Sequence, residues 1–461
     1  MNSTDLVIRN VRVVRGSGVS EPCDIIVREG KISGINASGL HPFNGEKIYD
    51  GGGLYALPGL VDLHFHSGLG SESRLYTEFN TESRAAVSGG FTYVRCHLIL
   101  GPDAQNGYLG KIDRIISRLE QESYADFGLN PQIGSMTHVA EMNQLIQKGI
   151  NAFKIFYDAY KGEEGRRIGI LVSDDIKKAV ISAMEEAAKH KHVRLMFHAE
   201  DADIVEHFTK RIATKGDKSL EALSQARPET AEEIKVREIS QLAKLFDAKI
   251  HFVHLSSKAA VEAAKEYMGK VDLTIETEPH YLIFDYTNKT IERYGSVNPP
   301  IRSPADKEYL INAIKTGVIN SVSTDTNPAS LKDKQNGMPG FDNIQIALPL
   351  MITFLVKTGI LDITHIARVM SESPARLVHA AAKGEIDVGK DADLVLIDLK
   401  DKSKLQDNDL VNVGGTEWFP YFEYELYGIP KAVFLRGSLI YERGNGVTHQ
   451  NGKFTPIKQE Q

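Results

Sequence analysis

Cysteine is scarce in this 461-residue chain, which contains only Cys23 and Cys96. Two cysteines cannot build the disulfide framework that stabilises many small secreted proteins. The N-terminal stretch MNSTDLVIRNVRVV also lacks the apolar segment and the cleavage site of a signal peptide. These absences predict a protein of a reducing compartment, most simply the cytoplasm.

Long apolar runs and an excess of basic charge are missing as well. The longest apolar run in the C-terminal half, IALPLMITFLV at 346–356, is too short to cross a bilayer. Lys and Arg number 54 against 61 Asp and Glu, which gives a formal net charge of −7 with no basic stripe. We therefore expect neither a membrane nor a nucleic acid as a partner.

Both ends of the chain show short, alternating strand patterns separated by Gly and Asn turns. Examples are DLVIRNVRVV near the N-terminus and KAVFLRGSLIYERG near the C-terminus. The patterns predict one small β-sandwich domain built from residues 1–55 and 385–450, followed by a C-terminal tail at 451–461. Residues 56–384 then form an inserted body.

In the inserted body, apolar strand segments alternate with helical segments. Strands are expected at 60–64, 91–96, 151–155, 193–198, 249–254, 271–276 and 319–324. Asp174 and Ser303 are expected as helix N-caps, and Gly149 and Gly317 as helix ends. Seven or eight such units favour an α/β fold whose parallel strands close into a (β/α)8 TIM-like barrel. No G-x-G-x-x-G follows an early strand, which argues against a dinucleotide-binding sheet.

Several of the expected strands end in a residue that can ligate a metal. In LVDLHFH the two histidines are separated by one residue, so both lie on one face of the strand. The carboxyl ends of barrel strands face a single mouth, where active sites occur. The residues expected to converge there are His64, His66, Lys154, His198, His254 and Asp325.

Four imidazoles and a carboxylate suit Zn²⁺ or a similar divalent ion. Lys154 does not fit such a site as an ammonium, because metal ions would repel it. A lysine amine that captures CO₂ becomes a carbamate, which is a carboxylate on a long arm and can bridge two metals. The residues permit this interpretation without requiring it.

An ordered set of motifs extends over nearly the whole chain. The motifs are GLVDLHFH, FKIF, HAED, FVHLSS, ETEPHYL, NPPIR, STD, NGMPG and SPARL…GKDADLVLID. Together they resemble the cyclic amidohydrolases of the amidohydrolase superfamily, a group that includes hydantoinases/dihydropyrimidinases, allantoinases and dihydroorotases. The resemblance implies a homodimer or homotetramer with two divalent metal ions, zinc being the first choice. It implies one metal on His64, His66 and Asp325, a second on His198 and His254, and carboxylated Lys154 bridging both.

The resemblance also implies the hydrolytic ring opening of a small cyclic amide. Two metal ions hold a hydroxide between them, the hydroxide attacks the ring carbonyl, and Asp325 acts as general base and proton shuttle. A tyrosine shortly after the bridging lysine donates to the developing oxyanion. FKIFYDAYKG favours Tyr160 for this role, but Tyr160 stands one residue beyond the hydantoinase spacing, so Tyr157 is the alternative.

Two asparagines are expected to bind the substrate ring. They are Asn298 in NPPIR and Asn336 in NGMPG, although Asn-Pro and Asn-Gly are equally ordinary turn signals. His280 in ETEPHYL is expected either near the metals or in a structural role. The other histidines, among them His97 and His251, are expected to be structural or solvated.

The choice of ring depends on a few departures from the family pattern. Position 68 is Gly68, where dihydroorotases carry an arginine that binds the substrate carboxylate, and the nearest arginine is Arg74. Thr326 follows the expected metal-binding aspartate, where the family often has histidine. NGMPG and AYKG favour a hydantoinase/dihydropyrimidinase-like activity. Allantoinase activity is the second choice, indicated by HLSS and PHYL, and dihydroorotase activity remains an alternative through NPPIR.

Two other classes of protein were weighed. A non-catalytic scaffold related to dihydropyrimidinase would lose metal ligands, whereas all six are present here. A mononuclear deaminase of the same superfamily would not need Lys154.

Overall fold

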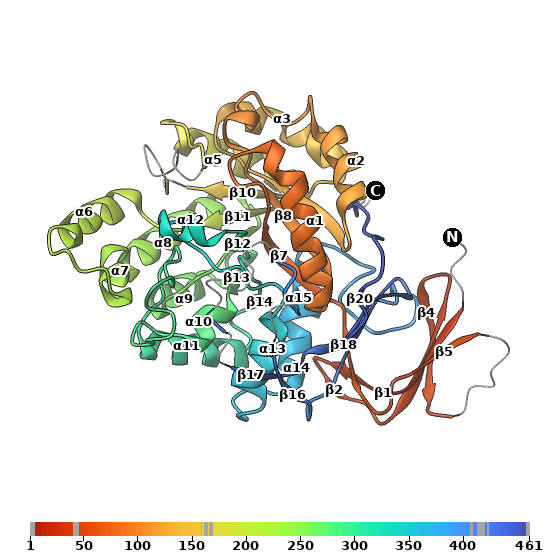
Figure 1. The fold of residues 1–461 in the computed structure, drawn as a ribbon. Coiled ribbons are helices and arrows are strands. Elements are labelled where there is room, and N and C mark those ends of the chain that lie inside the picture. The colour runs from red at the N-terminus through yellow and green to blue at the C-terminus, as the bar shows by residue number, and fades with distance from the viewer. Residues whose placement is uncertain are drawn as a thin grey trace.

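The computed structural model describes residues 5–39, 46–157, 159–160, 165, 169–405, 409–412, 420–421 and 424–457. At its centre, parallel strands follow one another in chain order in two sheets, β7-β8-β9 and β10-β11-β12-β13-β14 (Figure 1). These strands are β7 (Leu60–His66), β8 (Phe91–Leu98), β9 (Asp126–Pro131), β10 (Ala152–Phe156), β11 (Arg194–His198), β12 (Ile250–Phe252), β13 (Leu273–Thr277) and β14 (Ser321–Val322).

Two parallel bridges join these sheets into a ring. Gln132 pairs with Lys154 between β9 and β10, and Phe65 pairs with Thr326 between β7 and the end of β14. The His66 N–H donates to the Thr326 carbonyl at 3.1 Å, which closes the last gap. The eight-stranded barrel expected from the sequence is confirmed.

The apolar pattern missed β9. Its sequence, DFGLNP, contains Gly, Asn and Pro, which are poor strand formers. It is nevertheless a strand because its main chain pairs with β8, from Tyr93 opposite Asp126 to Leu98 opposite Pro131. All six residues of β9 are buried, so tertiary pairing overrides the local preference.

Helices cover the outside of the barrel (Figure 1). They are α1 (Glu72–Ser88), α2 (Ile112–Glu122), α3 (Met136–Gln147), α5 (Ile176–Ala188), α6 (Ala202–Ala213), α7 (Leu220–Ala226), α8 (Glu229–Phe246), α9 (Lys258–Lys265), α10 (Pro279–Ile283), α11 (Pro304–Lys315), α12 (Leu331–Gln335), α13 (Ala347–Met351), α14 (Ile363–Ala367) and α15 (Ser373–Leu377). Short non-α turns lie at Gly101–Ala104, Ile352–Val356 and Arg368–Glu372. The apolar run 346–356 is largely buried in α13 and the turn that follows it. In the described part of the chain, no helix is long and apolar enough to cross a membrane.

The helix boundaries follow most of the expected signals. Ser303 caps α11 in a capping box with Asp306. Gly149 and Gly317 follow α3 and α11 with positive φ angles of 87° and 77°, which glycine adopts without strain. The expected cap Asp174 is wrong by one residue, because α5 starts after Asp175 and has no side-chain cap.

Both chain ends contribute strands to one ten-stranded sheet beside the barrel (Figure 1). The strands are β1 (Leu6–Arg15), β2 (Gly18–Val19), β3 (Cys23–Arg28), β4 (Lys31–Ala37), β5 (Lys47–Asp50), β6 (Tyr55–Pro58), β15 (Leu394–Ile397), β18 (Pro430–Leu435), β19 (Ser438–Glu442) and β20 (Gly446–Val447). β1 pairs with β3 and β5 through its first half and with β6 at Arg12 and Val13, so it belongs to two faces that share an apolar core. A separate two-stranded antiparallel sheet pairs β16 (Lys402–Lys404) with β17 (Glu425–Tyr427). The exact domain boundaries at 55 and 385 stay a prediction.

The C-terminal segment pairs with the barrel. The Phe127 N–H of β9 donates to the Lys453 carbonyl, and the Thr455 N–H donates back to the Phe127 carbonyl. Farther along, the Ile457 N–H donates to the Gly149 carbonyl just before β10. Residues 452–457 therefore lie along the edge of β9 that faces away from β8.

Candidate metal centre

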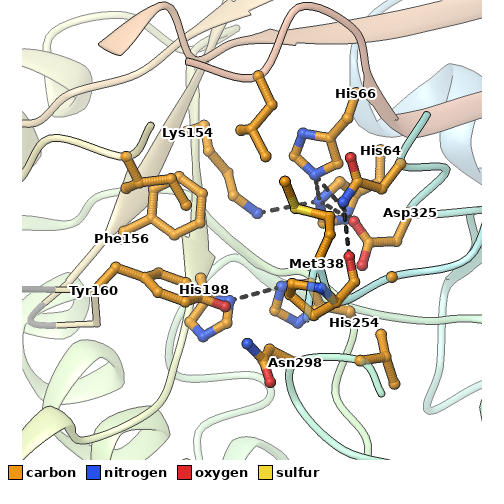
Figure 2. Close-up of a pocket in the computed structure, with 16 residues that line it drawn as sticks. His64, His66, Lys154, Phe156, Tyr160, His198, His254, Asn298, Asp325 and Met338 are labelled. Carbon is orange, nitrogen blue, oxygen red and sulfur yellow. Dashed lines mark hydrogen bonds and ion pairs between the residues drawn. The ribbon is translucent and has the colours of Figure 1, made fainter. Parts of the chain in front are cut away.

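The six side chains predicted to converge do lie together at the barrel mouth. His64 and His66 end β7, Lys154 lies in β10 and His198 ends β11, while His254 and Asp325 follow β12 and β14. None of the six is more than 9% exposed. All six line one pocket, shown in Figure 2.

Four of these residues form the first group of ligand atoms. His64 Nε2 lies 3.1 Å from His66 Nε2 and 3.1 Å from Asp325 Oδ1, and His66 Nε2 lies 3.0 Å from the same oxygen. Lys154 Nζ points at this group, 3.3 Å from His64 Nε2 (Figure 2). His64, His66 and Asp325 are spaced so that one metal ion could touch all three.

His198 and His254 form the second group. His198 Nδ1 faces His254 Nε2 at 2.9 Å, and the His64 and His254 rings stack with centroids 5.1 Å apart. One pair of neutral imidazoles can be held together by a hydrogen bond alone. Here two pairs, His64 with His66 and His198 with His254, lie at the same pocket together with the Asp325 carboxylate. A divalent cation fits this donor set, because imidazole nitrogens and carboxylate oxygens are ligands for zinc and similar ions.

Strained backbone places two of these side chains. His254 and Asp325 have φ angles of 40° and 47°, and Tyr160 beside them has 62°. Residues other than glycine seldom adopt this left-handed region, and such strain concentrates at functional sites. The strand pattern alone therefore did not determine where these residues point.

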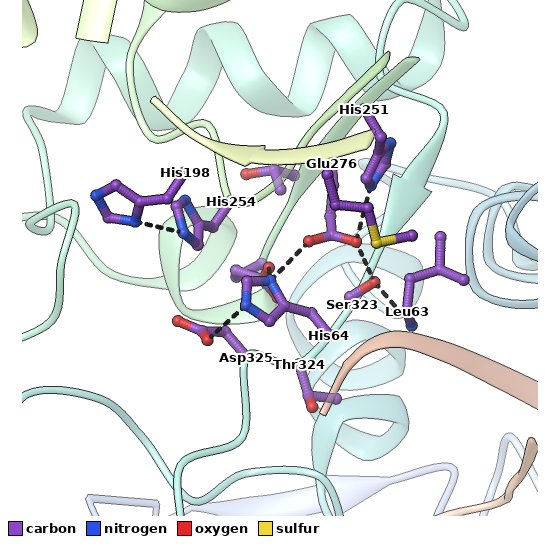
Figure 3. Close-up of polar contacts among 12 residues, drawn as sticks. Leu63, His64, His198, His251, His254, Glu276, Ser323, Thr324 and Asp325 are labelled. Carbon is purple, nitrogen blue, oxygen red and sulfur yellow. Dashed lines mark hydrogen bonds and ion pairs between the residues drawn. The ribbon is translucent and has the colours of Figure 1, made fainter. Parts of the chain in front are cut away.

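Two buried carboxylates, which the sequence analysis missed, hold the outer nitrogens of the histidines. His64 Nδ1 donates to Glu276 Oε1 at 3.0 Å, and Ser323 Oγ donates to Glu276 Oε2 at 2.6 Å (Figure 3). His198 Nε2 donates to Glu200 Oε2 at 2.8 Å, and Glu200 also accepts two hydrogen bonds from Arg227. Such partners fix the ring tautomer and leave the other nitrogen as a ligand. The signal for Glu200 was its place two residues after His198 in HAED.

Burial at the mouth favours the neutral forms of His64, His254 and Lys154. Burial, reinforced by the nearby Lys154, lowers the pKa of His64 well below its usual range, and burial does the same to the pKa of His254. Burial also lowers the pKa of Lys154 to about 8, although Asp325 and Glu276 act to raise it. A neutral imidazole can ligate a metal, and a neutral amine can react with CO₂.

Only one of the two candidate tyrosines lies in the pocket. Tyr160 lines it, with its ring 5.1 Å from the ring of His198. The Tyr157 hydroxyl instead donates to Glu238 Oε1 of α8 at 2.7 Å. Spacing in sequence from Lys154 could not decide between Tyr157 and Tyr160. The path of the chain after β10 does, because it brings Tyr160 to the pocket and turns Tyr157 toward α8.

The two expected substrate-binding asparagines differ in position. Asn298 lines the pocket, and Asn327 lines it as well, which the sequence analysis did not anticipate. Asn336 is exposed at the C-terminus of α12, where its N–H donates to the Lys332 carbonyl. Asn336 is not among the residues found to line the pocket, while its neighbours Met338–Gly340 are, and its role in substrate binding stays a prediction.

His280 and Thr326 have structural surroundings. His280 is buried against the ring of Phe341 and is not among the pocket residues. Burial lowers its pKa to about 3. Thr326 donates through Oγ1 to Asp342 Oδ1 at 3.2 Å, and its carbonyl accepts from His66, so it ties the strand ends together.

Arg74 is committed to a neighbouring carboxylate. Its Nε donates to Glu78 Oε1 at 2.7 Å, and Glu78 Oε2 accepts the Gly68 N–H at 2.6 Å. The pair fixes the turn after β7 rather than facing the pocket. Among the described residues, the lining of the pocket contains no lysine or arginine apart from Lys154, and it includes the apolar residues Leu69, Phe156, Ile170, Val297, Met338 and Pro339.

Comparison with known proteins gives a consistent result. The sequence profile of the Amidohydrolase family matches residues 55–440. The chain is 30% identical to a dihydroorotase of Methanothermobacter thermautotrophicus, covering 99% of this chain and 98% of that protein. It is also 30% identical to an allantoinase of Bacillus velezensis, covering 85% of each. Among solved structures, the L-hydantoinase (dihydropyrimidinase) from Arthrobacter aurescens matches 98% of this chain and 99% of its own, with 25% identity and a TM-score of 0.87.

Proposed function

Because the chain belongs to the amidohydrolase family, as the sequence motifs predicted, we propose that it opens an uncharged cyclic amide ring by metal-dependent hydrolysis. The preferred substrates are hydantoins or dihydropyrimidines with an apolar substituent. The observation that carries the proposal is the buried cluster of four histidines, one lysine and one aspartate beside an otherwise largely apolar pocket lining.

The donor set fits two divalent ions, with zinc as the first choice. His64, His66 and Asp325 would hold one ion, and His198 and His254 would hold the other. The outer nitrogens support this assignment, because His64 Nδ1 and His198 Nε2 donate to Glu276 and Glu200 and so leave the inward nitrogens with lone pairs for a metal. Bound metals supply Lewis-acid polarisation of the carbonyl and lower the pKa of water.

Lys154 is proposed to carry a carbamate between the two groups. The neutral Nζ forms a bond to the carbon of CO₂, one C=O electron pair moves to oxygen, and one N–H proton passes to solvent base. Burial supports this step, because it lowers the pKa of Lys154 to about 8 and so raises the share of neutral amine. The product is an anion where an ammonium would oppose a cation.

The chain's own residues would then divide the chemistry. Asp325, which touches both histidines of the first group, takes the proton of the attacking water and delivers it to the leaving ring nitrogen. Tyr160 donates to the carbonyl oxygen as negative charge develops there. Asn298 binds the ring amide, and Asn327 is added to it as a second polar contact.

The pocket lining favours a ring without a carboxylate. Dihydroorotate would need a cation to pair with its carboxylate, and Arg74 is bound to Glu78 instead. The apolar side chains from Leu69 and Phe156 to Met338 suit a hydrocarbon substituent by burying it. Allantoinase activity remains the second candidate, because the relative of that name covers most of the chain.

A hydrolysis screen tests the proposal directly. The zinc-loaded protein is assayed with 5-substituted hydantoins, dihydrouracil, allantoin and dihydroorotate, and ring opening is followed by loss of the cyclic amide. We expect hydantoins with apolar substituents to give the highest kcat/KM. Opening of dihydroorotate alone would show the choice of ring to be wrong, and failure to bind any divalent ion would favour the non-catalytic scaffold.

The oligomeric state and the location stay predictions. A homodimer or homotetramer is expected from the family resemblance, and a cytoplasmic location from the two free, buried cysteines. Light scattering of the purified protein tests the first expectation.

A further inference from the structure

His97, near the end of β8, has no role in the proposed mechanism although it lies among the site histidines. It stands opposite His66 in the parallel pairing of β7 with β8. Its ring lies 4.5 Å from the ring of His64 and 5.4 Å from that of His66, measured between centroids. The side chain is completely buried. From the sequence, His97 is expected to be structural or solvated.

Neither ring nitrogen of His97 has a hydrogen-bond partner among the described residues. Two other buried histidines of the barrel, His138 and His251, use both nitrogens. His138 accepts from the Gly134 N–H and donates to the Ala104 carbonyl, and His251 contacts Thr274 and Glu276. A buried polar group without a partner is costly, so a partner absent from the polypeptide is expected.

His97 does not extend the first metal group. The described ligand atoms that converge there are those of His64, His66 and Asp325, and no nitrogen of His97 joins them. A neutral imidazole always offers one N–H, so the missing partner includes an acceptor. The residue is kept neutral, because burial lowers its pKa well below the usual range.

The acceptor that fits is a carbamate oxygen, which Lys154 gains when its amine is carboxylated. Lys154 Nζ lies 3.3 Å from His64 Nε2, and the His64 ring packs edge-on against His97, so Lys154 and His97 both contact the same imidazole. Carboxylation would extend the Lys154 side chain by about 2 Å and add two oxygens. Each carboxylate oxygen has two lone pairs, so an oxygen that binds a metal can still accept a hydrogen bond.

We propose that His97 is a positioning residue that donates a ring N–H to the carbamate of carboxylated Lys154 and so retains the CO₂. The inference rests on the carboxylation proposed above. The His97 hydrogen bond would then hold the bridging carbamate in addition to the metal ions.

The test measures CO₂ retention rather than turnover. Wild-type protein and the variants His97→Leu, His97→Gln and His97→Asn are equilibrated with ¹³C-bicarbonate, and the lysine carbamate is quantified by ¹³C NMR beside the bound zinc. We expect His97→Leu to need about 10- to 100-fold more bicarbonate for half occupancy, the range for losing a hydrogen bond to a charged group. His97→Gln or His97→Asn, which keep an N–H, should recover part of the loss.

His280→Leu is the matched control. His280 is also completely buried with both ring nitrogens unpartnered among the described residues, but it lies against Phe341 outside the pocket lining. Its replacement should leave the bicarbonate requirement unchanged. An equal effect from both leucine variants would show that removing any buried imidazole has this result, and would overturn the proposal.

The remaining outcomes separate the two proposals. If wild-type protein shows no carbamate, the carboxylation itself is wrong. If wild type and His97→Leu retain CO₂ equally, only the role of His97 is wrong. Should His97→Leu fail to fold, a crystal structure of the carboxylated, zinc-loaded wild type decides. A ring nitrogen about 3 Å from a carbamate oxygen supports the role, and any other partner for His97 overturns it.

Discussion

Lys154 and Lys383 are both buried, and their surroundings are opposite. Lys154 lies at the mouth beside histidines, with Nζ 3.3 Å from His64 Nε2. Lys383 lies where the sheet domain meets the start of β9, with Nζ 2.6 Å from Asp126, 2.9 Å from Asp391 and 2.8 Å from Asp393. Burial lowers the pKa of both, but around Lys383 the three carboxylates outweigh it and raise the pKa.

Burial alone does not decide whether a lysine stays a charged ammonium, because the neighbouring carboxylates also act on it. Lys383 is a structural ammonium, because it neutralises carboxylates from two parts of the fold. Lys154 is available for chemistry, because its neighbours cannot neutralise it to the same extent. The two sites therefore predict different consequences for the same substitution.

The largest expected effect is the loss of activity in Lys154→Met. Without the proposed bridging group, kcat/KM should fall by about 10³-fold or more, since metal-ion stabilisation is worth several kcal/mol. Zinc content, measured by mass spectrometry, should fall below two ions per chain while the fold is kept. Unchanged activity with two bound ions would remove Lys154 from the mechanism.

Lys383→Met should lower the stability of the protein and leave its activity unchanged. Removing the ammonium takes the shared cation away from the buried Asp126 and Asp393 and the partly buried Asp391, which should destabilise the protein by about 3–5 kcal/mol. Denaturant unfolding measures the loss. The fraction that stays folded should bind two zinc ions and turn over as wild type does, and a metal defect there would contradict the division between the two lysines.

The metal-free protein should show a pH dependence that comes from Lys154. Its pKa is about 8 in the folded state and near 10.5 when unfolded, so the unfolded chain binds more protons between these values. Stability should therefore rise from pH 8 to 10.5, by about 3 kcal/mol relative to Lys154→Met at the upper end. Parallel unfolding curves for the two proteins over this range would contradict the lowered pKa.

Glu200→Gln should have the smallest effect. Glu200 holds the outer nitrogen of His198, and loss of such a support typically lowers metal affinity by about 10- to 100-fold. Competition with a chelator measures the affinity. Glu238→Gln is the control, because Glu238 binds Tyr157 and Lys235 outside the pocket and should leave zinc affinity unchanged.

Much of the candidate site followed from local patterns. His64 and His66 could be predicted because alternation along a strand puts both side chains on one face. Asp325 could be predicted because it ends an apolar segment. The supporting residues Glu200 and Glu276 were harder, since a carboxylate near a strand end has many possible partners. Their roles emerged only from the 2.8 and 3.0 Å contacts with His198 and His64.

The sequence by itself predicted the barrel, the two-ended sheet domain and which six side chains stand near strand ends, because periodicity and the alternation of strands with helices are visible in short stretches of sequence. Only the tertiary structure decided that Tyr160 rather than Tyr157 faces the pocket, that Asn336 ends a helix, that Arg74 is bound to Glu78, and that DFGLNP is a strand. Each of these depends on contacts between residues distant in the chain, which no short stretch of sequence encodes.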